Sequence, residues 1–456
     1  MSEERKENKM GVLPIPKLLI TMSLPMIISM LVQALYNVVD SMFVAQLNED
    51  ALTAVSLAFP VQNLMIAVAT GTGVGINALL SKSLGEHKFE QANTIAKNGV
   101  LLGVLSSLVF AILGLVGSRL FFTMQTNDPE IIKYGTDYMA IVTITSIGIF
   151  LQVTFERLMQ STGKTFYNMI IQGTGAIINI ILDPILIFGL FGLPKMEVAG
   201  AALATVIGQI VAATLGIILN FKYNKEIHLS FKGFKPCKET IGSIYKIGVP
   251  SIIMQSIGSL TTFGMNNILL MFSSTAATVF GVYFKLQSFI FMPVFGLTNG
   301  MIPIVAYNYG ARNKKRIYDT MKLSVIIAVS IMFIGVLIFQ FFPGALLSLF
   351  DASENMLAIG IPALQRISLS FIFAGFCIVC SSVFQALGNG MYSLIMSAAR
   401  QIVVILPVAF IFAKVFGLNA VWYSYPIAEV VSVIICIVLL IRIIKTKVRE
   451  IEEVTD

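Results

Sequence analysis

Apolar residues along this chain occur in long runs that are separated by short polar gaps. A helix needs about 20 apolar residues to cross roughly 30 Å of hydrocarbon, because each residue rises about 1.5 Å. Runs of this kind predict spanning helices at residues 18–46, 51–80, 93–117, 134–158, 163–190, 198–221, 241–271, 276–308, 318–342, 357–386, 391–416 and 419–444. The pattern predicts an all-α polytopic membrane protein with twelve transmembrane helices.

The pattern also repeats itself with a fixed offset of 225 residues. The matching residues include the pairs Pro25/Pro250, Gly71/Gly296, Gly75/Gly300 and Gly163/Gly388. Each copy holds six predicted helices, and an even number gives both copies the same orientation in the membrane. We therefore predict two pseudo-symmetric six-helix bundles, a layout typical of secondary transporters. The predicted domains are an N-terminal lobe (1–221), a cytoplasmic linker (222–240) and a C-terminal lobe (241–456).

Composition agrees with lipid as the solvent of most side chains. Only 12% of the residues are charged and 56% are hydrophobic, whereas soluble domains carry roughly 25% charged residues. The net charge of +7 reflects loop asymmetry and does not indicate nucleic-acid binding. The predicted inner segments hold 24 Lys and Arg residues and the outer loops hold 4. Because cytoplasmic loops of membrane proteins are enriched in these residues, we predict that both termini are cytoplasmic.

Motifs for other kinds of chemistry are incomplete. Cys377 and Cys380 form a CxxC inside an apolar run, where they read as two small side chains of a helix. Gly163-Lys164-Thr165 lacks the earlier glycine of a nucleotide-binding loop, since Leu158 stands there. No hydrolytic constellation is visible in the sequence. We therefore expect a protein that is not an enzyme and that has no cofactor.

Acidic residues inside the predicted spans are the main functional candidates. A carboxylate at membrane depth costs about 2.5–3.5 kcal/mol even on insertion scales. In the first half, Asp40 shares a helix face with Gln33 and Asn37. Asp183 shares a face with Asn168, Gln172 and Asn179, and Thr205 and Gln209 lie one turn apart on the next helix.

These polar faces can converge only in the interior of the first lobe. Their oxygen-rich set suits a Na⁺ ion or a proton held by the carboxylates, so we predict a coupling-ion site of Asp40, Asn179, Asp183, Asn37 and Thr205. If the ion is Na⁺, the metal ligands are Asp40, Asn179 and Asp183. A hydrogen-bonded packing cluster is the alternative. The proline that follows Asp183 favours the functional interpretation, because it removes a helical hydrogen bond beside the acid.

Charges and long apolar side chains elsewhere leave several roles open. Glu156 lies next to Arg157 and has a snorkelling, ion-pairing or functional role. In the second half Met265 and Val408 replace the acid pair, while Lys285, Arg366, Arg400 and Glu429 are new charges, of which the last two are placed to pair. Candidate substrate-cavity residues are Gln33, Gln62, Glu156, Gln209, Met254, Gln255, Met265, Lys285, Gln287, Met292 and Arg400.

Several of these segments together resemble the MATE (multidrug and toxic compound extrusion) family. The similar segments are LPMIISMLVQALYNVVDSMFVAQL, FERLMQSTGKTFYNMIIQ, NIILDPILIFG and VAGAALATVIGQ, combined with the repeated six-helix layout. The pattern is most similar to the DinF-related bacterial branch and to its MepA-like pumps. In that branch the helix 1 acid and the Asn and Asp of helix 5 bind the coupling ion. These match Asp40, Asn179 and Asp183, whereas the helix 7 acid of other branches falls near Gln255.

The resemblance implies an antiporter of the bacterial inner membrane that exports cationic and amphipathic drugs in exchange for H⁺ or Na⁺, and hence a role in antibiotic resistance. Its expected partners are lipophilic small molecules and the lipid bilayer, and the expected state is a monomer. The alternative is a lipid-linked oligosaccharide flippase of related fold, which predicts a cavity dominated by cations such as Lys285, Arg366 and Arg400. A channel or receptor without coupled transport is a further, weaker alternative.

Overall fold

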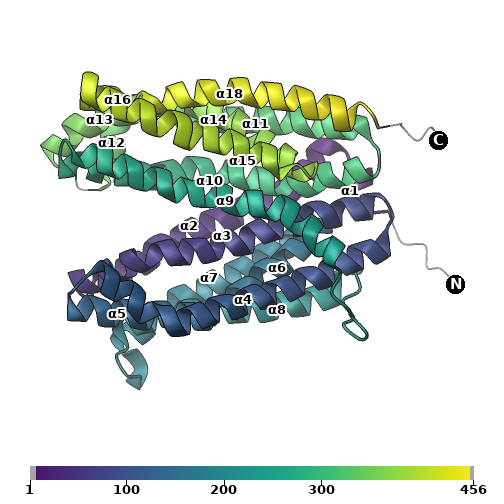
Figure 1. Cartoon of the computed structure of the whole chain (residues 1–456), viewed down its shortest axis with the longest axis horizontal. Coiled ribbons are helices and arrows are strands. Elements are labelled where there is room, and N and C mark those ends of the chain that lie inside the picture. Colours follow the sequence, from purple (N-terminus) through teal and green to yellow (C-terminus); the bar gives the residue numbers. More distant parts are fainter. Residues whose placement is uncertain (1–6, 351, 452–456) are drawn as a thin grey trace. The chain divides into compact units, whose positions relative to one another are not determined.

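The computed structural model describes residues 7–350 and 352–451, and every regular element among them is helical (Figure 1). Within these residues nine helical segments are long and apolar enough to cross a membrane. Two bent helix pairs raise the number to eleven. The predicted all-α polytopic fold is confirmed. The predicted cytoplasmic termini include residues 1–6 and 452–456, which lie outside the described part.

The first six predicted spans correspond to α2 (Ile15–Ala45), α3 (Glu49–Gly85), α4 (Phe89–Gln125), the bent pair α5 (Pro129–Ile144) and α6 (Ile147–Ser161), α7 (Thr165–Phe188) and α8 (Glu197–Tyr223). The last six correspond to α9 (Lys238–Leu270), α10 (Ser274–Gly310), α11 (Lys314–Phe341), the bent pair α13 (Glu354–Ser368) and α14 (Phe371–Ala386), α15 to α16 (Gly390–Val415) and α17 to η3 (Leu418–Val448). The helix α9 has the length of a span but carries many Ser, Thr, Asn and Gln side chains, and it is not among the segments that are apolar enough to count as one.

The chain forms two compact units whose boundaries fall inside α2 and α9. One unit, the N-unit, is Ile28–Ile252, and the other, the C-unit, is Met1–Ile27 with Ile253–Asp456. The two crossings are separated by the same 225 residues as the sequence repeat. The sequence prediction placed whole helices in each lobe, whereas each of these two helices contributes its first half to one unit and its second half to the other.

Glycines at equivalent positions of α10 and α3 let the first halves of α2 and α9 pack closely against those helices. In the C-unit, a Cβ on Gly296 of α10 would lie 2.5 Å from the Cα of Ile27, and one on Gly300 would lie 2.7 Å from the Cα of Ser23. In the N-unit, a Cβ on Gly71 of α3 would lie 2.8 Å from the backbone nitrogen of Ile252. Real Cβ atoms do not approach other atoms this closely, so these contacts between backbones require glycine.

The two bent pairs break where hydroxyl side chains bond to the preceding turn. The α5–α6 pair bends by 44° at residues 145–146, and the α13–α14 pair bends by 48° at residues 369–370. Thr145 donates a hydrogen bond to the carbonyl of Ile141, and Ser370 donates one of 2.6 Å to the carbonyl of Ile367. Such bonds compete with the helical ladder and bend helices.

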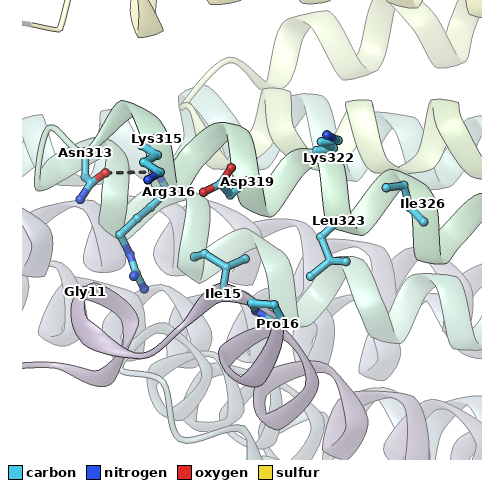
Figure 2. A pocket seen from close by; sticks show the side chains of 10 residues that line it. All are labelled: Gly11, Ile15, Pro16, Asn313, Lys315, Arg316, Asp319, Lys322, Leu323 and Ile326. Carbon is cyan, nitrogen blue, oxygen red and sulfur yellow. Dashed lines mark hydrogen bonds between the residues drawn. The ribbon is translucent and has the colours of Figure 1, made fainter.

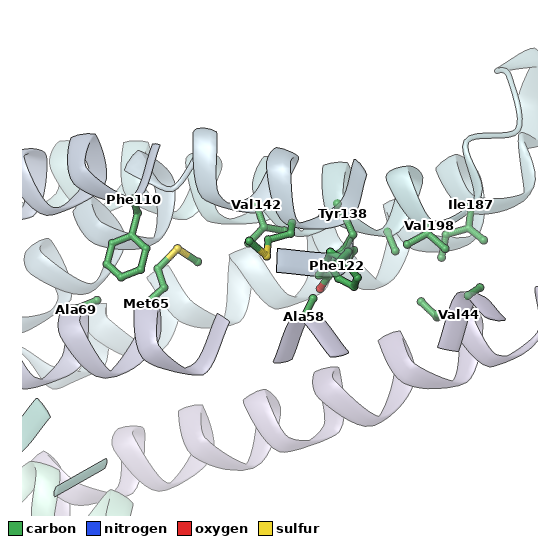
Figure 3. Packing of buried hydrophobic residues seen from close by; sticks show 14 of the residues in the cluster. Val44, Ala58, Met65, Ala69, Phe110, Phe122, Tyr138, Val142, Ile187 and Val198 are labelled. Carbon is green, nitrogen blue, oxygen red and sulfur yellow. The ribbon is translucent and has the colours of Figure 1, made fainter. Parts of the chain in front are cut away.

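The N-unit packs around an apolar core to which all seven helices from α2 to α8 contribute (Figure 3). Met65 of α3, Phe110 of α4 and Phe150 of α6 belong to this cluster, and the last two rings lie with centroids 5.6 Å apart. Tyr138 of α5 and Ile187 of α7 extend it toward the other end. This packing fixes α5, α7 and α8 relative to α3, and these helices carry the polar residues described below.

The connector between α8 and α9 is fastened to the N-unit. At its start the backbone N–H of His228 donates to the side chain of Asn93 (2.7 Å), and at its end that of Cys237 donates to Asn98 (3.0 Å). Both asparagines lie on α4. The segment predicted as a linker is therefore held along α4 by two buried amide acceptors.

In the C-unit, α11, α14 and α18 (Ser424–Ile443) lie side by side (Figure 1). The helix α18 also packs against η2 (Ala399–Ile405), a π-helical turn between α15 and α16. Arg400 lies on this turn. Because π-turns widen a helix locally, they redirect side chains and occur often near functional groups.

Candidate coupling-ion site

Close packing of α7 on α8 sets the position of the acidic site. A Cβ on Gly208 of α8 would lie 2.7 Å from the carbonyl oxygen of Gly175 of α7, and a Cβ on Gly200 would lie 2.6 Å from the carbonyl oxygen of Leu186. The two backbones therefore touch at two levels. Asn179 and Asp183 of α7 lie between these levels and face Thr205 of α8.

The Asn179 amide connects the two helices. With its nitrogen turned toward Asp183, that nitrogen lies 2.9 Å from Asp183 Oδ2. Its oxygen then accepts from the Thr205 hydroxyl at 3.1 Å and from the Thr205 backbone N–H at 2.9 Å. The opposite orientation gives only a 3.1 Å bond from the amide nitrogen to the Thr205 hydroxyl. The first orientation satisfies both ends of the amide, so we adopt it. All three residues are at most 3% exposed.

Asp40 of α2 completes the site by meeting Asp183. The two carboxyl groups lie close enough for their charges to interact directly. The Oδ1 atoms of both residues are buried and have no hydrogen-bond partner among the described residues. Neither residue takes part in any ion pair formed within residues 7–350 and 352–451. Two ionised carboxylates repel each other, so this arrangement is stable only with a proton or a cation between them.

Two tyrosines border the acid pair, and the sequence analysis did not select either one. The Tyr36 hydroxyl lies near that of Thr205, and Tyr36 is close enough to both acids to interact with them electrostatically. Tyr138 of α5 is also close enough to both acids to interact with them electrostatically. Its hydroxyl donates to Gln62 of α3 at 3.5 Å. Tyr36 stands one turn before Asp40, and that spacing was an available signal. Nothing in the local sequence distinguishes Tyr138.

Other residues predicted for the first lobe lie around the site or away from it. Gln172 donates to Gln33 at 2.9 Å, so one hydrogen bond joins these two amides. The Asn37 side chain is exposed, and within the described residues it makes no hydrogen bond to the acid pair. The Oε1 atom of Gln209 is buried without a partner there. The buried Glu156 accepts from Gln152 at 2.9 Å, and it forms no ion pair with Arg157 in the described residues.

The C-unit charges have partners of their own. Arg400 pairs with Glu429 at 2.9 Å, as the sequence analysis anticipated. Arg366 donates to the carbonyl of Asn419 at 2.6 Å and covers the Tyr423 ring. The Lys285 ammonium lies 5.9 Å from the centre of the Phe350 ring, and Lys285 itself is exposed.

The uncharged C-unit candidates are spread over two helices. Met265 is fully buried in α9 and therefore packs inside the unit. Met254 is partly buried and contacts the Ser381 hydroxyl at 3.9 Å. Gln255, Gln287 and Met292 are partly buried as well. The described residues of the C-unit contain no second pair of facing acids, in agreement with the loss of those residues from the repeat.

These features define a polytopic transporter built from two homologous helical halves, one of which holds a buried acid pair. The MatE family model matches the chain twice, at residues 25–185 and 250–411. The chain therefore belongs to the MatE family, whose members are transporters rather than enzymes. The two matches begin at Pro25 and Pro250, which is the offset of the internal repeat.

Similar proteins of known name cover nearly the whole chain. "Multidrug export protein MepA" of Staphylococcus haemolyticus (strain JCSC1435) is 29% identical over 417 residues, which is 91% of each chain. The protein of the same name from Staphylococcus aureus (strain MRSA252) is 29% identical over 418 residues, again 91% of each. The predicted relationship to MepA-like proteins is confirmed.

Solved structures of this family have the same fold. "Crystal structure of MATE in complex with MaL6" matches with a TM-score of 0.92 and 25% identity, covering 98% of this chain and 100% of that one. A "MOP superfamily transporter from Pyrococcus furiosus", described as having reverse polarity of its binding pocket, matches with a TM-score of 0.91 and 25% identity over 97% of this chain and 99% of that one. MATE structures in a bent and in a straight conformation also match at 25% identity, with TM-scores of 0.90 and 0.92.

Proposed function

We propose that this protein is a secondary antiporter that exports cationic or amphipathic drugs across the bacterial plasma membrane in exchange for H⁺ or Na⁺. The names of its relatives support the export of small molecules. The observation that carries the proposal is the contact between Asp40 and Asp183, each of which has a buried oxygen without a partner among the described residues. Each such atom costs about 1–3 kcal/mol, and a cation bound between the two acids would satisfy both oxygens.

The site offers the ligands that a small hard cation requires. Asp40 and Asp183 supply carboxylate oxygens, and Asn179 and Thr205 supply neutral oxygens nearby. Oxygen ligands of this type suit Na⁺, and the paired acids equally suit a shared proton. The bond from Asn179 engages Oδ2 of Asp183, which leaves its Oδ1 atom available for the cation. The cation is therefore bound where α2 meets α7.

Coupling follows if the cation and the drug favour different conformations. A ligand shifts an equilibrium only by the difference between its affinities for the two states. Cation binding neutralises the repulsion between Asp40 and Asp183, so it stabilises the conformation in which α2 and α7 are close. Cation release allows the two helices to separate, and we propose that drug binding favours that separated state.

The flippase alternative has less support. It requires a cavity dominated by cations, but Arg400 is paired with Glu429 and Arg366 with a backbone carbonyl. The ammonium of Lys285 lies against an aromatic ring. Each of these three cations is thus engaged by a local partner.

Drug efflux from everted membrane vesicles tests the proposal. An imposed Na⁺ gradient and an imposed pH gradient are applied separately, with ethidium as the transported probe. We expect accumulation of ethidium with one of the two gradients and its collapse with the matching ionophore. Equal ethidium movement with no gradient, or uptake of a lipid-linked oligosaccharide in its place, would refute the antiporter assignment.

The orientation in the membrane is part of the same proposal. We propose that the protein is a multi-pass monomer with both termini in the cytoplasm, because Lys and Arg are concentrated in the segments that this topology places inside. Labelling of single cysteines introduced at Lys232 and at Lys195 with an impermeant reagent checks this. The label should reach only position 195 in intact cells.

A further inference from the structure

A groove runs along the start of α11, beside the N-terminal segment of the C-unit (Figure 2). Its volume is about 640 Å³. All of its lining residues belong to the C-unit: Gly11, Ile15, Pro16, Asn313, Lys315, Arg316, Asp319, Lys322, Leu323 and Ile326. The groove lies at the start of α2 whereas Asp40 lies near the end of that helix, and the proposed transport cycle assigns the groove no role.

Arg316 builds one wall of this groove by holding the N-terminal segment in place. Its side chain donates to Asn308 Oδ1 at 3.0 Å and to the backbone carbonyls of Met10 (2.9 Å) and Leu13 (2.7 Å). Asn308 also donates to the Met10 carbonyl at 3.0 Å. These bonds satisfy the end of α1 (Lys9–Val12) and make the groove a built feature rather than a loose surface crease.

Two exposed lysines give the groove an excess of positive charge. Lys315 and Lys322 line it together with Arg316, against the single carboxylate of Asp319. Neither lysine takes part in an ion pair within the described part of the chain. The groove therefore carries a local charge of about +2, since its lining holds three cations and one anion. An anionic ligand would find unused donors here.

The groove changes from charged to apolar along α11. Residues 315, 319, 322 and 326 follow the spacing of one helix face, and they span about 16 Å at a rise of about 1.5 Å per residue. Lys315 lies at the beginning of this spanning helix, while Leu323 and Ile326 lie further into it, and Ile326 is 52% exposed. Ile15 and Pro16 line the groove as well. A ligand that fits both ends must carry an anionic head and an apolar tail.

We propose that this groove binds an anionic phospholipid whose headgroup carries hydroxyl groups, such as phosphatidylglycerol. The phosphate lies between Lys315 and Lys322, a headgroup hydroxyl donates to Asp319, and an acyl chain follows Leu323 and Ile326. Basic pockets at the cytoplasmic end of spanning helices suit anionic headgroups. The bound lipid fixes the N-terminal segment against α11, independently of drug or coupling ion.

Lipid binding to the purified full-length chain tests this inference. Native mass spectrometry counts the lipids retained when the protein in detergent is mixed with phosphatidylglycerol, with phosphatidylcholine, or with inorganic phosphate and glycerophosphoglycerol, which lack acyl chains. We expect selective retention of phosphatidylglycerol. The double variant Lys315→Gln/Lys322→Gln should bind it roughly 30-fold more weakly, because each cation near an anionic surface is worth about fivefold.

A matched control removes two other exposed lysines of the same predicted membrane side. Lys232→Gln/Lys235→Gln, in the connector between α8 and α9, should retain phosphatidylglycerol as the unaltered protein does. Equal loss in both double variants, or equal binding of phosphatidylcholine, would overturn the assignment. Binding of inorganic phosphate or glycerophosphoglycerol with the same affinity as the lipid would overturn it too, since the acyl chain would then contribute nothing.

Discussion

The carboxyl group of Asp40 on α2 meets that of Asp183 on α7, and Asn179 holds the second of these from one side. This contact joins a helix that passes between the two units to a helix that lies wholly within the N-unit. Under the proposed function, a cation bound here would act directly on α2, one of the two helices that run from one unit into the other.

Neutralising either acid should weaken the coupling-ion site. We expect Asp40→Asn and Asp183→Asn each to lower the apparent affinity for Na⁺ or H⁺ roughly 5- to 150-fold, because a lost buried contact to a charged group costs about 1–3 kcal/mol. The double variant should bind the ion little more weakly than the single variant that has the lower ion affinity, since both residues form one site. The measurement is ethidium efflux in proteoliposomes as a function of the driving ion.

Asp137→Asn is the control for this experiment. Asp137 is exposed on α5, so its neutralisation should leave the ion dependence unchanged. Strictly additive losses in the double variant, or a comparable loss in the control, would show that the two acids do not share an ion.

The Thr205 hydroxyl should contribute less than the acids. Thr205→Val removes the hydroxyl bond to the Asn179 amide at nearly constant volume. We expect ion affinity to fall about fivefold, since one such hydrogen bond is worth about 1 kcal/mol. Thr214→Val on the same helix is the control, because Thr214 is exposed and donates only to the carbonyl of Ile210. An unchanged ion response in Thr205→Val would remove this residue from the site.

Sequence reasoning could bring the two acids together because membrane depth makes each one costly. Helical spacing then placed Asn179 and Asp183 on one face, and only the interior of the lobe can receive such a face. Asn37 illustrates the limit of this reasoning: it lies one turn from Asp40, yet its side chain is exposed. Tyr36 and Asn37 stand four and three residues before Asp40, so they lie on opposite sides of the helix face that carries it. Only the packing of neighbouring helices decides which of the two is buried near the acids.

Other features depend on contacts between distant segments and were not predictable from local patterns. Tyr138 reads as an ordinary residue of an apolar span until α5 is packed against α3. The part of α2 up to Ile27 belongs to the C-unit, where it packs closely against Gly296 and Gly300. These two glycines are more than 250 residues away in the sequence. Hydropathy gives the length of a helix but not the neighbours of each half.

The contact between α7 and α8 yields a prediction about stability. Gly208→Val forces a side chain against the Gly175 carbonyl, which would lie 2.7 Å from its Cβ. We expect a loss of about 1–3 kcal/mol, as for other overpacked cores, together with reduced ion affinity, because Thr205 and Asn179 separate. Thermal unfolding in detergent measures the first effect.

Gly173→Ala on α7 provides the comparison for this variant. A Cβ at Gly173 would meet nothing within 4 Å, so alanine should be neutral or should stabilise the helix by about 0.5–1 kcal/mol. If Gly208→Val unfolds at the same temperature as Gly173→Ala, the close approach of α7 and α8 does not exist in the membrane protein.

The buried pair of Arg400 and Glu429 should act as one structural unit in the C-unit. Its side chains are 23% and 7% exposed, and the Arg400 Nε and Glu429 Oε2 atoms have no hydrogen-bond partner within the described residues. Removing one charge strands the other, so Arg400→Met and Glu429→Leu should each cost about 3–5 kcal/mol, whereas the double variant should be nearly neutral. Lys414→Met, at an exposed position on α16, should change stability by less than about 0.5 kcal/mol.

Thermal unfolding in detergent and ethidium transport together decide the role of the pair. A double variant that is stable but no longer transports would mean that these charges contact the drug, and a double variant as unstable as the singles would mean that they are not coupled.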